Sequence, residues 1–136
     1  MIFRFLLICL LGFCCAESMA ASKCTKNDLT GPVVISYTFG SGSSYQEGYC
    51  GIMTSRPDFQ AFCLNTTYVE FFDVIKSRTS VKPNCQYQVD LTLSDQVVTF
   101  KGKLDRATGN GSGNALSKGK GFKLIGTHTL VTAVPQ

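Results

Sequence analysis

The chain contains no tryptophan and a single histidine, and only 16% of its 136 residues are charged. One histidine, His128, excludes every mechanism that needs two, such as a nuclease built on a histidine pair. Because there is no tryptophan and there are only five tyrosines to stack on sugar rings, we expect a protein partner rather than a glycan. Long apolar runs are also lacking. The run Phe5–Phe13 reaches about half of the roughly twenty residues that a spanning helix needs, so we expect no transmembrane anchor.

What the N-terminus does contain is a targeting pattern. The basic Arg4 stands before the apolar run Phe5–Phe13, and the small-residue segment Ala16–Ala20 follows it. A basic, then apolar, then small-residue order is typical of a secretory signal peptide. We therefore expect residues 1–20 to be a signal peptide and residues 21–136 to form one β-rich, secreted, extracellular domain.

The cysteines fit this compartment. Removal of residues 1–20 leaves an even number of them, namely Cys24, Cys50, Cys63 and Cys85. In an oxidising compartment four cysteines predict two disulfides. Three pairings are possible and the sequence does not choose among them. We favour Cys24–Cys85 with Cys50–Cys63, which nests a short loop in a long one. A zinc site would need closely spaced pairs that the chain lacks, so no metal and no cofactor are expected.

Two tripeptides match the acceptor pattern for N-glycosylation. They are Asn65-Thr66-Thr67 and Asn110-Gly111-Ser112. Asn110 falls in a segment that we expect to be an exposed loop, whereas Asn65 is close to Cys63 and could be partly sheltered. The expected protein is a glycoprotein, with Asn110 as the better acceptor.

Strand patterns dominate the remainder of the chain. Residues 33–39 are rich in β-branched and aromatic side chains, and residues 85–93 alternate apolar with polar. Residues 94–96 predict a turn into a second strand over 97–104, and the apolar segment 122–134 predicts a central or bent strand. The expected fold is mainly β: a small, disulfide-stapled antiparallel β-sandwich or barrel-like domain.

One segment, residues 67–78, allows a short helix as well as a strand. Thr67 and Glu70 have the spacing of a capping box, and Tyr68, Phe71 and Ile75 would share one helical face. Their side chains are nevertheless strand formers. The sequence leaves both alternatives open.

Two segments are candidate binding surfaces. The glycine-rich segment 105–121 reads as a long loop, and with its flanks it carries Lys101, Lys103, Lys118 and Lys120. It is either a solvated loop or a site for a polyanion such as a sulfated glycan. The net charge of +4 permits anionic partners without requiring them, and nucleic acid is not the expected partner. The second candidate is the segment 40–49, in which Tyr45 and Tyr49 stand among small polar residues as in adaptable binding loops.

Catalysis has little support in the sequence. His128 lies in a strand-like run, where a structural histidine is commoner than a general base. A set of His128 with Glu70 and either Arg56 or Arg78 could cleave a phosphodiester, provided that the fold brings these residues together.

These observations favour a secreted, non-enzymatic interaction protein, such as an effector, inhibitor or recognition module, that binds an extracellular or host protein through loops on a β scaffold. Two alternatives stay open. One is a small secreted hydrolase of the ribonuclease type, and the other is a carrier of an apolar ligand, because several strands are apolar on both faces.

Overall fold

The computed structural model describes residues 23–29, 31–53 and 61–132. The predicted signal peptide, residues 1–20, and Arg56 lie outside these ranges. Two 3₁₀ turns, η2 (Lys26–Leu29) and η3 (Gly42–Ser44), accompany the strands. In the described ranges no helix has the length and apolar character to cross a membrane. The strands are β1 (Pro32–Phe39), β2 (Gln46–Met53), β3 (Ala61–Asn65), β4 (Glu70–Asp73), β5 (Lys76–Val81), β6 (Gln86–Thr92), β7 (Gln96–Leu104), β8 (Gly111–Gly119) and β9 (Phe122–Thr132).

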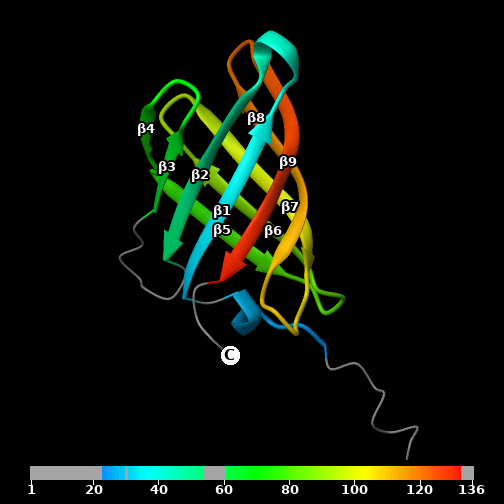
Figure 1. Cartoon of the computed structure of the whole chain (residues 1–136). Helices are drawn as coiled ribbons and strands as arrows, with labels where there is room; N and C mark the ends of the chain where they lie inside the picture. Colours follow the sequence, from blue (N-terminus) through cyan, green and yellow to red (C-terminus); the bar gives the residue numbers. More distant parts are fainter. Residues whose placement is uncertain (1–22, 30, 54–60, 133–136) are drawn as a thin grey trace, which may run out of the picture.

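The nine strands of the described ranges belong to one antiparallel sheet in the order β4-β3-β2-β1-β9-β8-β7-β6-β5. The sheet curls on itself into a half-barrel, so that β5 and β6 cross behind β1 and β2 (Figure 1). The prediction of an antiparallel, barrel-like β domain is thereby confirmed. The hairpin around residues 94–96 and the central strand near the C-terminus are also present, as the β6–β7 turn and as β9 between β8 and β1.

The curl follows from how the chain passes between the two edges of the sheet. Strands β4 and β5 are opposite edges, yet only Val74 and Ile75 separate them. The N–H group of Val74 donates to the Ala61 carbonyl of β3 (3.3 Å), whereas the N–H group of Ile75 donates to the Thr92 carbonyl of β6 (2.8 Å). Because the backbone changes partner within two residues, the two edges must meet at this corner.

Of the two alternatives that the sequence left open for residues 67–78, the structure has strands and excludes the helix. Asn65 Oδ1 accepts hydrogen bonds from the backbone N–H groups of Thr67 and Tyr68, which forms a tight turn instead of a helix cap. Strand β4 then folds back onto β3, and Phe71 and Ile75 are 65% and 70% exposed. The predicted helical face therefore does not exist, and the strand preference of these side chains prevails.

The prediction of a long glycine-rich loop over residues 105–121 is wrong. Most of this segment forms β8, which pairs with β7 on one side and with β9 on the other. Its glycines supply space instead of flexibility. A Cβ on Gly113 would lie 2.0 Å from the Lys101 carbonyl oxygen, and a Cβ on Gly111 would lie 2.6 Å from the ring of Tyr87. Glycine inside a strand is typical of such close approaches.

Alternate side chains of each strand fill the inside of the half-barrel. At the end opposite the β8–β9 turn, η2 lies across the opening (Figure 1), and its Leu29 is 1% exposed. The largest fully buried apolar side chains are Phe100, Leu29, Ile35, Leu91, Leu130, Val33 and Val89.

Both favoured disulfides are present. Cys24–Cys85 ties the segment before η2 to the start of β6, and Cys50–Cys63 joins directly opposed residues of β2 and β3. The zinc alternative does not arise, because all four described cysteines are paired with one another.

Removing the bridges should destabilise the protein unequally, because the bonded cysteines are 61 residues apart in Cys24–Cys85 and 13 in Cys50–Cys63. From the chain entropy of the unfolded state, the Cys24→Ala/Cys85→Ala variant should lose about 4 kcal/mol and the Cys50→Ala/Cys63→Ala variant about 3 kcal/mol. Denaturant unfolding measures both. A larger loss for the second variant would show that packing of its buried sulfurs, and not chain entropy, dominates.

The close approach of β7 and β8 predicts that Gly113→Ala costs about 2 kcal/mol or more, because the atom that a Cβ would meet belongs to the backbone and cannot rotate away. Ser112→Ala, at the neighbouring exposed position, is the matched control and should change stability by less than about 0.5 kcal/mol. Equal unfolding midpoints for the two variants would contradict this reading of β8.

Candidate functional site

His128 lies on the inner face of β9 and is 3% exposed. Its Nδ1 donates to the Asn114 carbonyl at 2.9 Å, and because a carbonyl only accepts, this bond fixes the proton on Nδ1. The Tyr87 hydroxyl then donates to Nε2 at 2.5 Å. Both ring nitrogens are therefore occupied, and the ring also packs against Phe100 at a centroid distance of 5.1 Å.

Burial controls the protonation of this pair. Desolvation lowers the pKa of His128 below its ordinary value of 6.5, although the carbonyls of Asn114 and Gly113 act in the opposite direction. Desolvation also raises the pKa of Tyr87 far above its ordinary value. The pair is thus a neutral histidine accepting from a neutral tyrosine.

The hydrolase set is not brought together. In the pairing order Glu70 lies four strands away from His128, and Arg78 lies on β5, where it is opposite Asp90. Within the described ranges no hydrogen bond or ion pair joins His128 to Glu70 or to Arg78. The arrangement around His128 holds strands together and leaves no lone pair for a general base.

The four lysines fall into two separate groups. Lys101 and Lys103 point outward from β7, and together with Lys82 they line a groove of about 450 Å³. Lys118 stands opposite Lys123 on β9, and Lys120 lies in the β8–β9 turn. Lys118 pairs with Val97, four residues from Lys101, so the two groups are roughly 13 Å apart along the strands. The sequence had grouped them as one basic segment.

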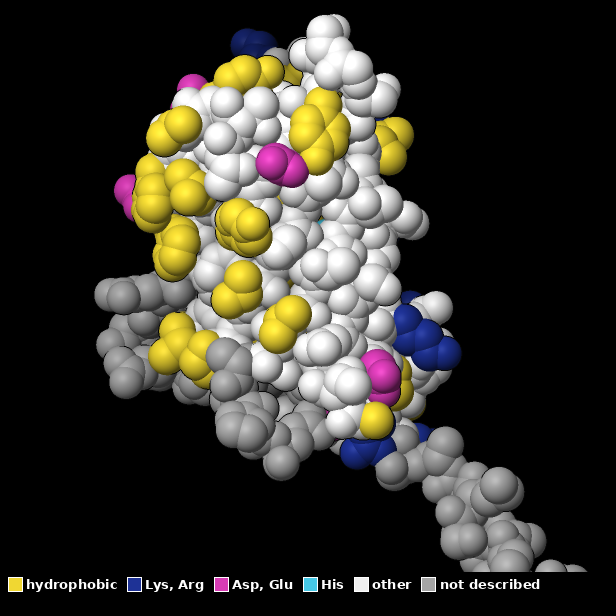
Figure 2. Space-filling view, viewed as in Figure 1, with side chains coloured by type: hydrophobic (Ala, Val, Ile, Leu, Met, Phe, Trp, Pro, Cys, Tyr) yellow, Lys and Arg dark blue, Asp and Glu magenta, His cyan; other side chains and the backbone are white. Residues whose placement is uncertain are grey.

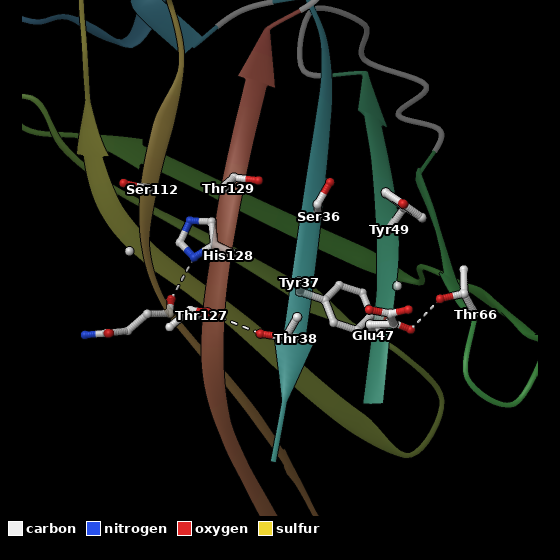
Figure 3. A pocket seen from close by; sticks show the side chains of 13 residues that line it. Ser36, Tyr37, Thr38, Glu47, Tyr49, Thr66, Ser112, Thr127, His128 and Thr129 are labelled. Atoms are coloured by element: carbon white, nitrogen blue, oxygen red, sulfur yellow. Dashed lines mark hydrogen bonds between the residues drawn. The ribbon is translucent and has the colours of Figure 1, made fainter. Parts of the chain in front are cut away.

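A shallow groove of about 590 Å³ crosses the outer face of β8, β9, β1 and β2. Figure 3 shows its hydroxyl-bearing side chains, including Ser36, Thr38, Thr127 and Thr129, side by side on β1 and β9. Thr38 and Thr127 share a hydrogen bond of 3.2 Å. Among the described residues that line the groove, Glu47 carries the charge. The groove is therefore polar, and His128, which also lines it, has both ring nitrogens hydrogen-bonded.

The two predicted tyrosines have different surroundings. Tyr45 is 42% exposed, and its hydroxyl donates to Glu47 Oε2 at 2.8 Å. Tyr49 is 49% exposed and stands opposite Leu64 on β3, which in turn stands opposite Phe71 on β4. Tyr49 therefore belongs to a larger surface that the sequence did not reveal.

We call this surface the apolar outer face. It covers the convex side of β4, β3, β2, β1 and β9, and Figure 2 shows hydrophobic side chains gathered over the part of the molecule where β4, β3 and β2 lie. Its sequence signal was the run of aromatic residues around β4, which was read as the buried face of a possible helix. The members are Tyr49, Phe62, Leu64, Phe71, Val34 and Val131.

The two glycosylation acceptors also differ in their surroundings. Asn110 is exposed in the turn between β7 and β8. Asn65 is 5% exposed, and its Nδ2, the atom that would carry a glycan, donates to Gln46 Oε1 at 3.0 Å. Asn110 lies beside the β9 end of the apolar outer face, because its neighbour Gly111 pairs with Leu130, the residue before Val131.

Comparison with known proteins gives no further guidance, since no family model, curated protein or solved structure matches this chain.

The buried histidine predicts how stability depends on pH. Below pH 6.5 the unfolded chain binds a proton at His128 that the folded chain excludes, so stability should fall as the pH decreases, by up to about 1.4 kcal/mol per pH unit. Above pH 6.5 the ring is neutral in both states and adds no slope. Urea unfolding of wild type and His128→Gln across this range measures the difference. An identical slope in both proteins would assign the dependence to other groups.

Proposed function

We propose that this protein is a secreted, non-enzymatic interaction module that binds an extracellular protein through the apolar outer face. The observation that carries the proposal is the exposure of large apolar side chains on adjacent strands. Phe71, Tyr49 and Phe62 are 65%, 49% and 45% exposed. Contiguous apolar surface of this kind is uncommon on a monomer unless it binds something.

The centre of the face is rigid. The rings of Phe62 and Phe71 stack at a centroid distance of 5.3 Å with an interplanar angle of 12°. Phe62 also lies over Gly51 of β2, where a Cβ would come within 2.8 Å of its ring. Because the two rings are already ordered, binding costs little side-chain entropy. Rigid, clustered aromatic side chains are typical of the residues that dominate binding energy at protein interfaces.

The face continues to the free edge of the sheet. Among the described strands, β4 pairs with β3 and has no partner on its other side. Such an edge offers unpaired backbone groups to an added strand. Asp73 lies at one end of β4 on the same side as Phe71, so a matching partner segment would combine apolar with basic side chains.

A protein fits this surface better than the alternatives do. The groove lined by Lys82, Lys101 and Lys103 lies elsewhere on the sheet, and the groove lined by hydroxyl groups, which meets the face at Tyr49, is polar. Both nitrogens of His128 are already hydrogen-bonded inside the protein. The two disulfides suit an oxidising compartment, in line with the secretion that we propose.

The proposal predicts that Phe71→Lys weakens partner binding by about tenfold or more, because it places a charge in the centre of the interface. The partner is captured from extracellular fractions with the wild-type protein and purified, and its Kd is then measured for each variant by surface plasmon resonance.

Ile125→Lys is the matched control. Ile125 is 66% exposed, nearly the same as Phe71; it shares the outer side of β9 with Val131 but lies six residues from it and four strands from β4 in the pairing order. This variant should bind like wild type. If both substitutions weaken binding equally, or if no saturable partner is found, the apolar outer face is not the binding site.

A further inference from the structure

A second surface lies on the inside of the half-barrel, at the end opposite η2. The turns between β3 and β4, between β6 and β7 and between β8 and β9 surround it (Figure 1). The cavity here measures about 530 Å³, which is within the range of small-molecule sites. Its lining residues on the walls include Tyr37, Phe39, Phe72, Val98, Leu124 and the Cys50–Cys63 disulfide.

The lining is unusually aromatic. Five rings contribute to it, from Tyr37, Phe39, Tyr68, Phe72 and Phe122. Tyr68 and Phe122 are 53% and 40% exposed and stand at the mouth, whereas Tyr37 and Phe39 are buried deeper. The faces of aromatic rings attract cations, and clusters of them recognise alkylated ammonium groups.

The charged residues of the lining also favour a cation. Glu70 and Asp95 line the cavity and are exposed at its mouth, and no basic residue of the described ranges joins them in the lining. The charge of the lining is thus opposite in sign to the net charge of the whole chain, which has thirteen Lys and Arg against nine Asp and Glu. Neither carboxylate has an ion pair or a side-chain hydrogen bond to another described residue.

Two glutamine side chains on the wall are held by hydrogen bonds to neighbouring side chains. Gln46 Oε1 accepts from Asn65 Nδ2 at 3.0 Å, and Gln96 Oε1 accepts from Ser117 Oγ at 2.5 Å. Both Gln side chains line the cavity. These bonds hold both side chains in place on the wall of the cavity.

We infer that this cavity binds a small organic cation with an apolar body, such as a protonated aromatic amine or a quaternary ammonium compound. The apolar body fills the aromatic interior, and the cationic group lies between the rings and the carboxylates of Glu70 and Asp95. This site is distinct from the apolar outer face, since neighbouring residues of one strand point to opposite sides: Phe72 lines the cavity whereas Phe71 belongs to the outer face.

The test uses the folded, disulfide-bonded protein and three indole probes that differ in charge: tryptamine is cationic, N-acetyltryptamine is neutral and indole-3-propionate is anionic. The chain has no tryptophan, so the indole fluorescence of each probe reports its binding without a tryptophan background from the protein. Tryptamine should bind about tenfold more tightly than either analogue. Benzyltrimethylammonium, measured by calorimetry, should compete with it.

Variants then locate the site. Glu70→Gln and Asp95→Asn should each weaken tryptamine binding about threefold to tenfold. Asp73→Asn, which removes an exposed carboxylate from the same strand as Glu70 but outside the cavity lining, should not. Equal affinity for the three probes, an equal loss with Asp73→Asn, or no saturable binding of either cation at millimolar concentration would overturn the inference. Phe71→Lys should leave tryptamine binding unchanged, so the two proposals fail or stand separately.

Discussion

The buried hydrogen bond from the Tyr87 hydroxyl to His128 Nε2 is the interaction on which the inside of this protein depends. Tyr87 is on β6 and His128 on β9, so the tyrosine must cross β7 and β8 to reach it. It can do so because Gly102 and Gly111 carry no side chains beneath its ring. The bond also needs a neutral histidine, which burial favours. This one hydrogen bond therefore requires glycine at positions 102 and 111 and a neutral side chain at His128. Tyr37 makes a similar contact: its side chain crosses Gly48 of β2, and its hydroxyl donates to the Leu64 carbonyl of β3 at 3.3 Å.

A second constraint shapes the molecule at its corner. The chain leaves one edge of the sheet at β4 and enters the other at β5 with Val74 and Ile75 between them. A flat sheet of nine strands could not be joined in this way, so the corner and the curl require each other. The curl separates an inner side, which is closed at one end by η2 and open at the other, from an outer side that is available to large partners (Figure 1).

The two proposed sites occupy the two sides of the same wall. Along β3 and β4, Phe62, Leu64 and Phe71 point outward, whereas Cys63, Asn65 and Phe72 line the cavity. The simple alternation of a strand thus supports both a flat apolar surface for a protein and an enclosed aromatic pocket for a small cation. The Cys50–Cys63 bridge lies in this wall and fixes β2 to β3. Because this disulfide links β2 to β3 on the inner side, it holds in place the strands that carry both surfaces.

The sequence by itself determined the strands whose pattern is local. The alternation over residues 85–93, the β-branched run at 33–39 and the turn at 94–96 all predicted elements that exist. The even count of cysteines predicted two disulfides, although it did not determine which cysteines pair. Tertiary structure alone decided the rest. It turned 67–78 into two edge strands and the glycine-rich segment into β8, and it gathered the apolar outer face and the cavity from residues far apart in the chain. The physical reason is that a side-chain pattern reports which residues seek burial, whereas the space above a glycine and the partner of an edge strand depend on segments that the chain brings together only when it folds.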